Sequence, residues 1–297
     1  MSDDFQHGAA KSDGNLLSIG ATIAEALRLC WSNRKLLGRF MILPVAMSTL
    51  LGLASLAFYE WSDQTASRMI WSFGIFIPDF LVLTWFAVAC HRLILIGAGA
   101  VAEFGLTRWT WRETRFFLWM LLAYTIGYLF MLLGNTTLFA VAFFVANACG
   151  FSTQTISLIM EHQPFFLGMI LFASIPFAYV VGRLSLLLPA TAIDLRTSVN
   201  SAWDLSERNG WRVAILVGGI PIAFMAIQSL IWMIPSWLFG ESLHKIQSTL
   251  DVASIGLIFL QSVLRYVFAT IEIAILSITF RRLRTIEEQK LTAPLST

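Results

Sequence analysis

Six long stretches of apolar residues, separated by short polar segments, run along the chain. A helix needs about 20 apolar residues to cross the hydrocarbon of a bilayer, and each stretch is close to that length. The pattern therefore predicts an all-α, polytopic membrane helix bundle. Its six transmembrane helices are expected at about residues 36–58, 75–98, 115–134, 164–189, 212–238 and 253–280.

The third stretch leaves its own path open, because the chain stays apolar from Arg115 as far as Cys149. It fits one tilted helix, two helices, or one span followed by a re-entrant or interfacial segment. The second part, 138–149, is short for a crossing of its own. The path of residues 135–163 is therefore not fixed by the sequence.

Two shorter stretches have apolar residues at helical spacing instead of a continuous run. They are "SIGATIAEALRLCW" before the first span and "TSVNSAWDLSERNGW" before the fifth. We expect both to form amphipathic helices at the membrane interface. With them, the membrane domain covers residues 16–284, between a disordered polar tail (1–15) and a cytoplasmic C-terminal tail (285–297).

Composition agrees with this pattern. The chain is 57% hydrophobic and 13% charged, whereas a soluble domain carries about 25% charged residues. The net charge of +2 is too small to indicate nucleic-acid binding. Membrane lipids, a membrane-protein partner and a second copy of the chain are the partners that such a composition favours.

The distribution of basic residues predicts the orientation. With six spans, one side of the membrane receives almost all the lysines and arginines, and the other side keeps Arg68 and Lys245. Cytoplasmic loops are enriched in these residues, so both termini are expected in the cytoplasm. A seventh span would break the asymmetry.

Four arginines are expected at the cytoplasmic ends of the even-numbered spans. We call Arg92, Arg183, Arg281 and Arg282 the basic collar. A planar guanidinium suits a lipid phosphate or another anion, but long basic side chains also reach the headgroups merely to orient a helix. The residues "LSLLLPA" after Arg183 either complete the fourth span or bend at Pro189 into the interface.

Polar residues within the spans form a second set of candidates. Ser254, Gln261, Arg265 and Glu272 fall within about 40° of one another on the sixth helix. A charge such as that of Arg265 costs at least about 2.5 kcal/mol at mid-membrane. The charge of Arg265 therefore indicates either a functional site or an ion pair within the helix to Glu272, which lies about 10 Å along the axis. His91 and Asp79 on the second span are also embedded, but they do not make a proton relay.

No motif for an active site, a metal site or a cofactor is evident. The chain has no Walker loop, no H-E-x-x-H and no G-x-S-x-G sequence. We therefore expect no cofactor, no metal and no catalytic residue, and the sequence favours a protein that is not an enzyme.

Three segments resemble a bacterial inner-membrane family with about six spans and no assigned function. They are "CHRLILIGA" in the second span, "GRLSLLLPATAIDLRTSVNSAWDLSERNGWR" after the fourth and "ILSITFRRL" at the end of the sixth. That family is similar to the membrane domain that precedes some glycerophosphodiester phosphodiesterases. The resemblance implies a helical protein of the bacterial inner membrane. It does not imply phosphodiesterase activity, because the loops are too short for a catalytic barrel of about 250 residues.

These observations predict a structural or accessory protein that binds an anionic lipid headgroup or a membrane partner at the basic collar. The alternative is a small transporter or channel. Its path would pass Arg265 and Glu272, beside helices loosened at Pro176 and Pro221.

Overall fold

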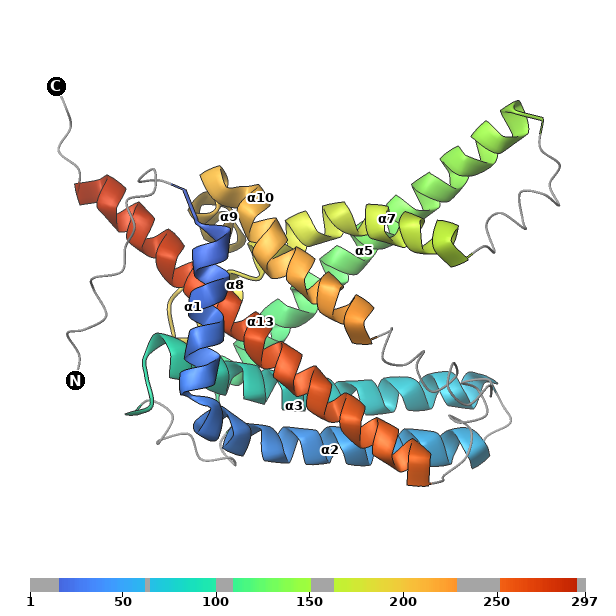
Figure 1. Cartoon of the computed structure of the whole chain (residues 1–297), viewed down its shortest axis with the longest axis horizontal. Helices are drawn as coiled ribbons and strands as arrows, with labels where there is room; N and C mark the ends of the chain where they lie inside the picture. The colour runs from blue at the N-terminus through green and yellow to red at the C-terminus, as the bar shows by residue number, and fades with distance from the viewer. Residues whose placement is uncertain (1–15, 62–64, 100–108, 151–162, 229–251, 293–297) are drawn as a thin grey trace.

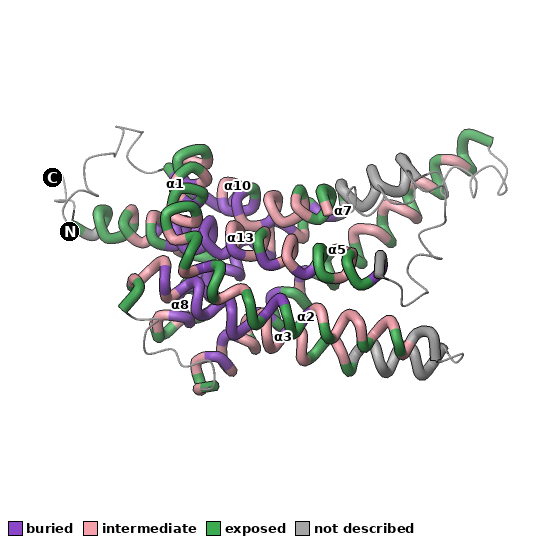
Figure 2. Tube along the Cα trace, turned by 60° about the horizontal axis from the view of Figure 1, so that its bottom comes forward, coloured by how far each residue is buried: buried purple, intermediate pink, exposed green. Residues whose placement is uncertain are grey.

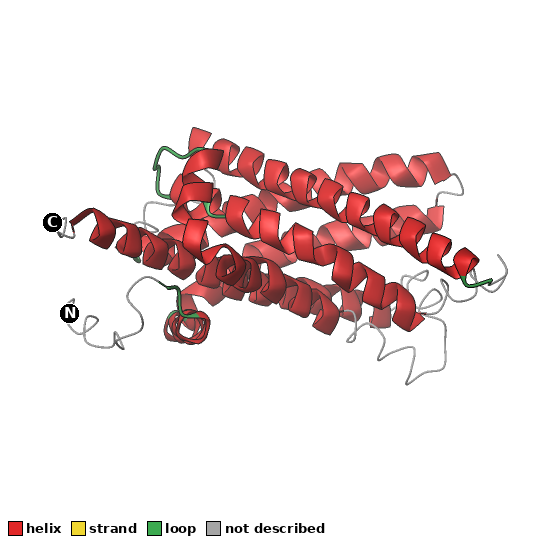
Figure 3. Ribbon diagram, turned by 90° about the horizontal axis from the view of Figure 1, so that it is seen from above, coloured by secondary structure: helices red, strands yellow, loops and turns green. Residues whose placement is uncertain are grey.

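The computed structural model describes residues 16–61, 65–99, 109–150, 163–228 and 252–292, and the regular elements among them are all helices (Figure 3). The long helices are α2 (Arg34–Trp61), α3 (Thr65–Leu95), α5 (Trp111–Ala148), α7 (Gln163–Leu184) and α13 (Val252–Thr292). The short ones are α1 (Ile19–Ser32), α8 (Leu187–Ala192), α9 (Val199–Leu205) and α10 (Gly210–Val213).

Six helices of the described part are long and apolar enough to cross a membrane. They cover Arg34–Phe58, Gly74–Leu95, Trp111–Ala148, Ser174–Ala192, Glu207–Gln228 and Ser254–Lys290. The predicted all-α bundle with six membrane-spanning helices is therefore confirmed.

The third span is a single helix. α5 continues from Trp111 to Ala148 without a break, so of the three predicted alternatives the one long helix is correct. Its 38 residues extend about 57 Å, well beyond the hydrocarbon thickness of about 30 Å, so the helix must tilt or project from the membrane. Residues 151–162 of the predicted loop lie outside the described part.

The fourth span is broken. α7 ends at Leu184, the chain turns at Ser185 and Leu186, and α8 follows. All six residues of α8 are buried, where it packs against α3 and α5. The stretch after Arg183 therefore completes the span, and the chain turns before Pro189 instead of bending there into the interface.

The fifth span begins with α10 and continues through a π-helical segment, Ala214–Gly219, which we call η2, into helix 220–228. This span packs closely against α7 because small residues meet at the contact. A Cβ atom at Gly218 would lie 2.6 Å from the backbone of Ala178, and one at Gly182 would lie 3.1 Å from the Cα of Ala214. On each helix the two small residues of this contact are spaced four positions apart.

α1 crosses the long helices at a steep angle (Figure 1). Ser18 caps its start by accepting a hydrogen bond from the backbone of Ala21. Its inner face buries Thr22 and Ala26 against α13, while Leu27 and Trp31 remain exposed. This arrangement suits the predicted amphipathic helix before the first span.

The second predicted amphipathic stretch forms α9 and the 3₁₀ helix Glu207–Asn209. Ser198 starts α9 with a capping box to Ser201. Asn209 then accepts a hydrogen bond from the backbone of Leu17 at 2.8 Å, which ties the two stretches together at one end of the bundle.

The core lies around α8 and the adjoining parts of α3 and α13, in the half of the molecule that carries α1 (Figure 2). Phe86, Leu187, Ile275 and Ile278 are almost completely buried there. α13 stays helical past residue 284, so the first part of the predicted C-terminal tail, 285–292, continues this helix. The predicted tail 1–15 lies outside the described residues.

Candidate functional site

The basic collar does not form one site, because its four arginines lie in three separate places, each with its own hydrogen-bond partners. Arg92 lies near Ala192 and Asp194. Arg183 is held by residues of α7 and the α9 region. Arg281 and Arg282 both pair with Glu25 of α1.

Arg183 is a buried structural residue, only 4% exposed. Its Nε donates to Ser206 Oγ at 2.8 Å, and its two terminal nitrogens donate to the Tyr179 hydroxyl at 2.9 Å and to the Trp203 carbonyl at 2.7 Å. The guanidinium carbon also lies 3.8 Å from the centre of the Trp203 ring. The expectation that Arg183 reaches the headgroups is therefore wrong.

The charge of Arg183 is stabilised by helix ends rather than by an acidic side chain. No carboxylate of the described residues pairs with it, but it lies in the last turn of α7 and contacts the last turn of α9. Carbonyls at the C-terminal end of a helix carry negative partial charge. Two such ends, together with the aromatic face of Trp203, favour a buried cation at this place.

We expect Arg183→Lys to lower the free energy of unfolding by about 2 kcal/mol. An ammonium cannot reproduce the planar fork, so about two of the three hydrogen bonds, each worth about 1 kcal/mol, are lost. Thermal unfolding in mild detergent measures the effect, with Arg208→Lys at an exposed position as the matched control. Bound lipid should be unchanged, and a loss of lipid at unchanged stability would contradict the structural role.

Arg281 and Arg282 attach α1 to the C-terminal half of α13. Glu25 accepts hydrogen bonds from both guanidiniums, and Arg282 also donates to the backbone of Ala21. The same end of the bundle is held by Arg212, which donates to the Leu17 carbonyl at 2.7 Å. These contacts account for both collar arginines as links between helices.

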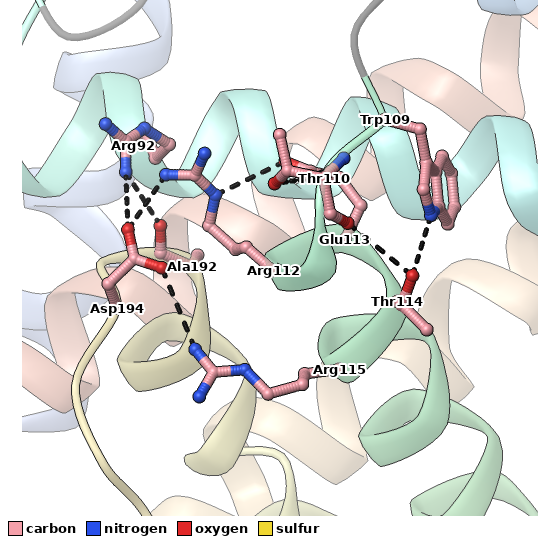
Figure 4. Close-up of polar contacts among 9 residues, drawn as sticks. All are labelled: Arg92, Trp109, Thr110, Arg112, Glu113, Thr114, Arg115, Ala192 and Asp194. Carbon is pink, nitrogen blue, oxygen red and sulfur yellow. Dashed lines mark hydrogen bonds and ion pairs between the residues drawn. The ribbon is translucent and has the colours of Figure 1, made fainter.

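Arg92 belongs to a cluster that the collar prediction did not include. Arg112 and Arg115 in the first turns of α5 and Arg92 near the end of α3 surround Asp194, two residues after α8 (Figure 4). We call these four residues the Asp194 cluster.

Only one contact to Asp194 is a close hydrogen bond. Arg112 donates to Asp194 Oδ2 at 2.9 Å, whereas the nearest nitrogens of Arg92 and Arg115 lie 3.6 and 3.7 Å from the carboxylate. The Asp194 side chain is 54% exposed, and its backbone has a φ of 60°. The cluster is thus open at the carboxylate and more buried around the arginines.

The start of α5 positions Arg112. Glu113 is completely buried, accepts a hydrogen bond from the backbone of Thr110 at 2.7 Å and lies 3.3 Å from Arg112 Nε. Trp109 Nε1 donates to Thr114 Oγ1 at 2.8 Å beside it (Figure 4). The capping box therefore fixes the turn of helix from which two of the arginines extend.

The sequence contained a signal for this cluster. In "TWRETR", residues 110–115, Thr110 and Glu113 have the spacing of a capping box, and two arginines follow at i and i+3. The part that the sequence could not show is the approach of Asp194, which depends on the turn between α7 and α8.

Arg265 forms an ion pair with Asp79 of α3, not with Glu272. Ser48 of α2 also donates to Asp79, and its hydroxyl lies 3.1 Å from that of Tyr266. The interpretation of an internal Arg265–Glu272 bond is therefore wrong. The charge is neutralised instead by a network that joins three helices.

The other intramembrane candidates lie apart. His91 is 1% exposed, and its Nδ1 lies 2.7 Å from Ser277 Oγ, which links α3 to α13. Gln261 is exposed on α13. Glu272 is half-buried, and it takes part in no hydrogen bond or ion pair among the described residues.

Among the described residues no group of three or more His, Cys, Asp or Glu side chains could hold a metal ion. Comparison with protein-family models, curated proteins and solved structures finds no match to this chain. The resemblance noted in the sequence stays a prediction.

Proposed function

We propose that this chain is a non-enzymatic accessory protein of the bacterial inner membrane that binds an anionic lipid headgroup at the Asp194 cluster. Both termini would lie in the cytoplasm, as the excess of arginine and lysine on that side favours. The family resemblance of the sequence supports the bacterial membrane. Of the basic collar, this proposal keeps Arg92 and adds Arg112 and Arg115.

The observation that carries the proposal is the excess of positive charge around Asp194. Among the described residues, the three guanidiniums of the cluster face two carboxylates, that of Asp194 and that of the adjoining Glu113, which leaves a net charge of +1. The Arg115 side chain is 34% exposed. An anion can therefore reach the cluster from outside the protein, and guanidiniums are suited to phosphate.

Exposed tryptophans support placement at headgroup depth. Trp109 and Trp111 are 43% and 68% exposed at the start of α5, beside the cluster. Tryptophan is enriched at membrane interfaces because its ring is apolar and its N–H is polar. The same depth favours contact between the arginines and lipid phosphates.

We expect Arg115→Gln to reduce the anionic lipid that co-purifies in mild detergent by about fivefold, since a charge-assisted hydrogen bond contributes about 1 kcal/mol or more. Quantitative lipid mass spectrometry measures this. Arg284→Gln is the matched control, because Arg284 lies near the end of α13 and pairs only with Glu288 among the described residues. An equal loss in both variants would show a dependence on charge alone and contradict a specific site.

A transporter or channel remains the second candidate. The observation in its favour is that Arg265 keeps 37% of its side chain exposed within a membrane-spanning helix. The π-helical segment η2 ends just before Pro221, and such segments are frequent at functional sites. Its support is weaker, because Asp79 already neutralises Arg265 within the protein.

A further inference from the structure

The Asp194 carboxylate has too few oxygens to accept a hydrogen bond from every guanidinium around it. It has two oxygens, while three guanidiniums approach it from α3 and α5, and only Arg112 reaches hydrogen-bond distance. Arg115 Nε is buried and has no hydrogen-bond partner among the described residues. A group with more oxygens would use these donors better than Asp194 does.

Two of the three arginines, Arg92 and Arg112, have contacts other than Asp194 that hold them in position. Arg92 donates to the Ala192 carbonyl at 3.2 Å, and Arg112 Nε is held at 3.3 Å from Glu113. Asp194 itself lies outside α8 and α9, in the connection between them. Its side chain can therefore turn away without disturbing a helix or the placement of these two guanidiniums.

We propose that Asp194 occupies the place of a phosphomonoester group, which is the natural ligand of this cluster and displaces the carboxylate when it binds. This rests on the proposed function, since it names the class of headgroup that the same site takes. A phosphomonoester offers three terminal oxygens, so each of the three arginines can receive one.

The charges favour the same class. Once Asp194 has turned away, the three guanidiniums and the Glu113 carboxylate leave a net charge of +2 among the described residues of the site. A phosphomonoester carries about −1.5 to −2 at pH 7 and therefore balances it. A phosphodiester has only two free oxygens and a single negative charge, so it has no advantage over the Asp194 carboxylate already in place.

The test compares two lipids on the whole protein in mixed micelles, with native mass spectrometry as the readout. Phosphatidic acid supplies a phosphomonoester and phosphatidylglycerol a phosphodiester. We expect wild-type protein to bind phosphatidic acid at least about fivefold more tightly, which corresponds to about 1 kcal/mol.

Asp194→Asn is expected to tighten phosphatidic acid binding further, by about fivefold or more, because the competing charge is gone. Asparagine keeps the shape of the side chain and tolerates a positive φ, so the fold should persist, and thermal unfolding verifies that. Asp204→Asn, at an exposed position on α9, is the matched control and should change nothing.

Two results would overturn the inference. One is equal affinity for both lipids, and the other is weaker phosphatidic acid binding in Asp194→Asn, which would make the carboxylate part of the binding site. If Arg115→Gln weakens both lipids alike and Asp194→Asn has no effect, the proposed function stands and this inference falls. If Arg115→Gln changes neither lipid, both fall.

A last experiment distinguishes a lipid phosphomonoester from a soluble one. Inorganic phosphate is added to the lipid-free protein and to its Arg115→Gln variant. Phosphate binding that requires Arg115 would assign the cluster to a soluble phosphomonoester, whereas Arg115-dependent binding of phosphatidic acid alone assigns it to the lipid. Both results support the phosphomonoester.

Discussion

Gly218→Ala is expected to lower the free energy of unfolding by about 3 kcal/mol, at the upper end of the usual range for overpacking. The added methyl carbon would lie 2.6 Å from the Cα and the carbonyl oxygen of Ala178. These are backbone atoms, so no side chain can turn aside, and α7 must move away from η2. Steric trapping, which monitors unfolding of the protein in bicelles, measures the loss of stability.

Gly219→Ala supplies the control from the neighbouring position. The nearest atom to its added methyl group would be the Ala214 carbonyl oxygen at 3.9 Å, which is an ordinary contact. Its stability should therefore stay within about 0.5 kcal/mol of wild type, as is usual for substitutions that disturb no packing. Equal effects of the two variants would mean that the close contact between Gly218 and Ala178 does not hold the helices together.

Asp79→Asn is expected to cost about 3 kcal/mol, because it leaves the Arg265 guanidinium without its counter-charge in a membrane-spanning helix. The value is at the lower end for a broken buried pair, since Arg265 keeps 37% of its side chain exposed. The same unfolding measurement applies. Gln261→Leu, at an exposed position one turn before Arg265, is the control and should cost little.

The double variant Asp79→Asn/Arg265→Gln separates the ion pair from the rest of the site. Because neither charge remains, we expect it to be more stable than the sum of the two single changes predicts, by at least about 1 kcal/mol. Additive effects would contradict the pair. A transporter would show a different result, with solute flux through liposomes falling in Arg265→Gln while stability is retained.

The number and approximate position of the spans could be predicted because apolar length alone determines them. α5 shows the limit of this reasoning. Its apolar run is longer than a crossing needs, and apolar length alone does not show that it continues as one helix to Ala148. In the fourth span the sequence left open whether the residues after Arg183 complete the span or bend at Pro189 into the interface. The chain turns earlier, at Ser185 and Leu186, so that α8 can enter the core.

The partners of the charged residues were the least predictable part. Arg265 and Glu272 share a face of one helix. The partner of Arg265 is nevertheless Asp79 of α3, a residue 186 positions away in the sequence. Helical periodicity shows which residues share a face, and it does not show which helix packs against that face. Arg183 illustrates the same limit, because the α9 region folds back over it and removes it from the surface.

The central claim is that an anionic headgroup binds at the Asp194 cluster, and photocrosslinking tests it most directly. A phosphatidic acid analogue with a diazirine next to the phosphate is bound to the wild-type protein and activated, and the labelled peptides are identified by mass spectrometry. The account predicts labels concentrated in residues 109–116 and 192–195. Labels spread evenly over the basic residues, or concentrated at Arg281 and Arg282, would contradict it.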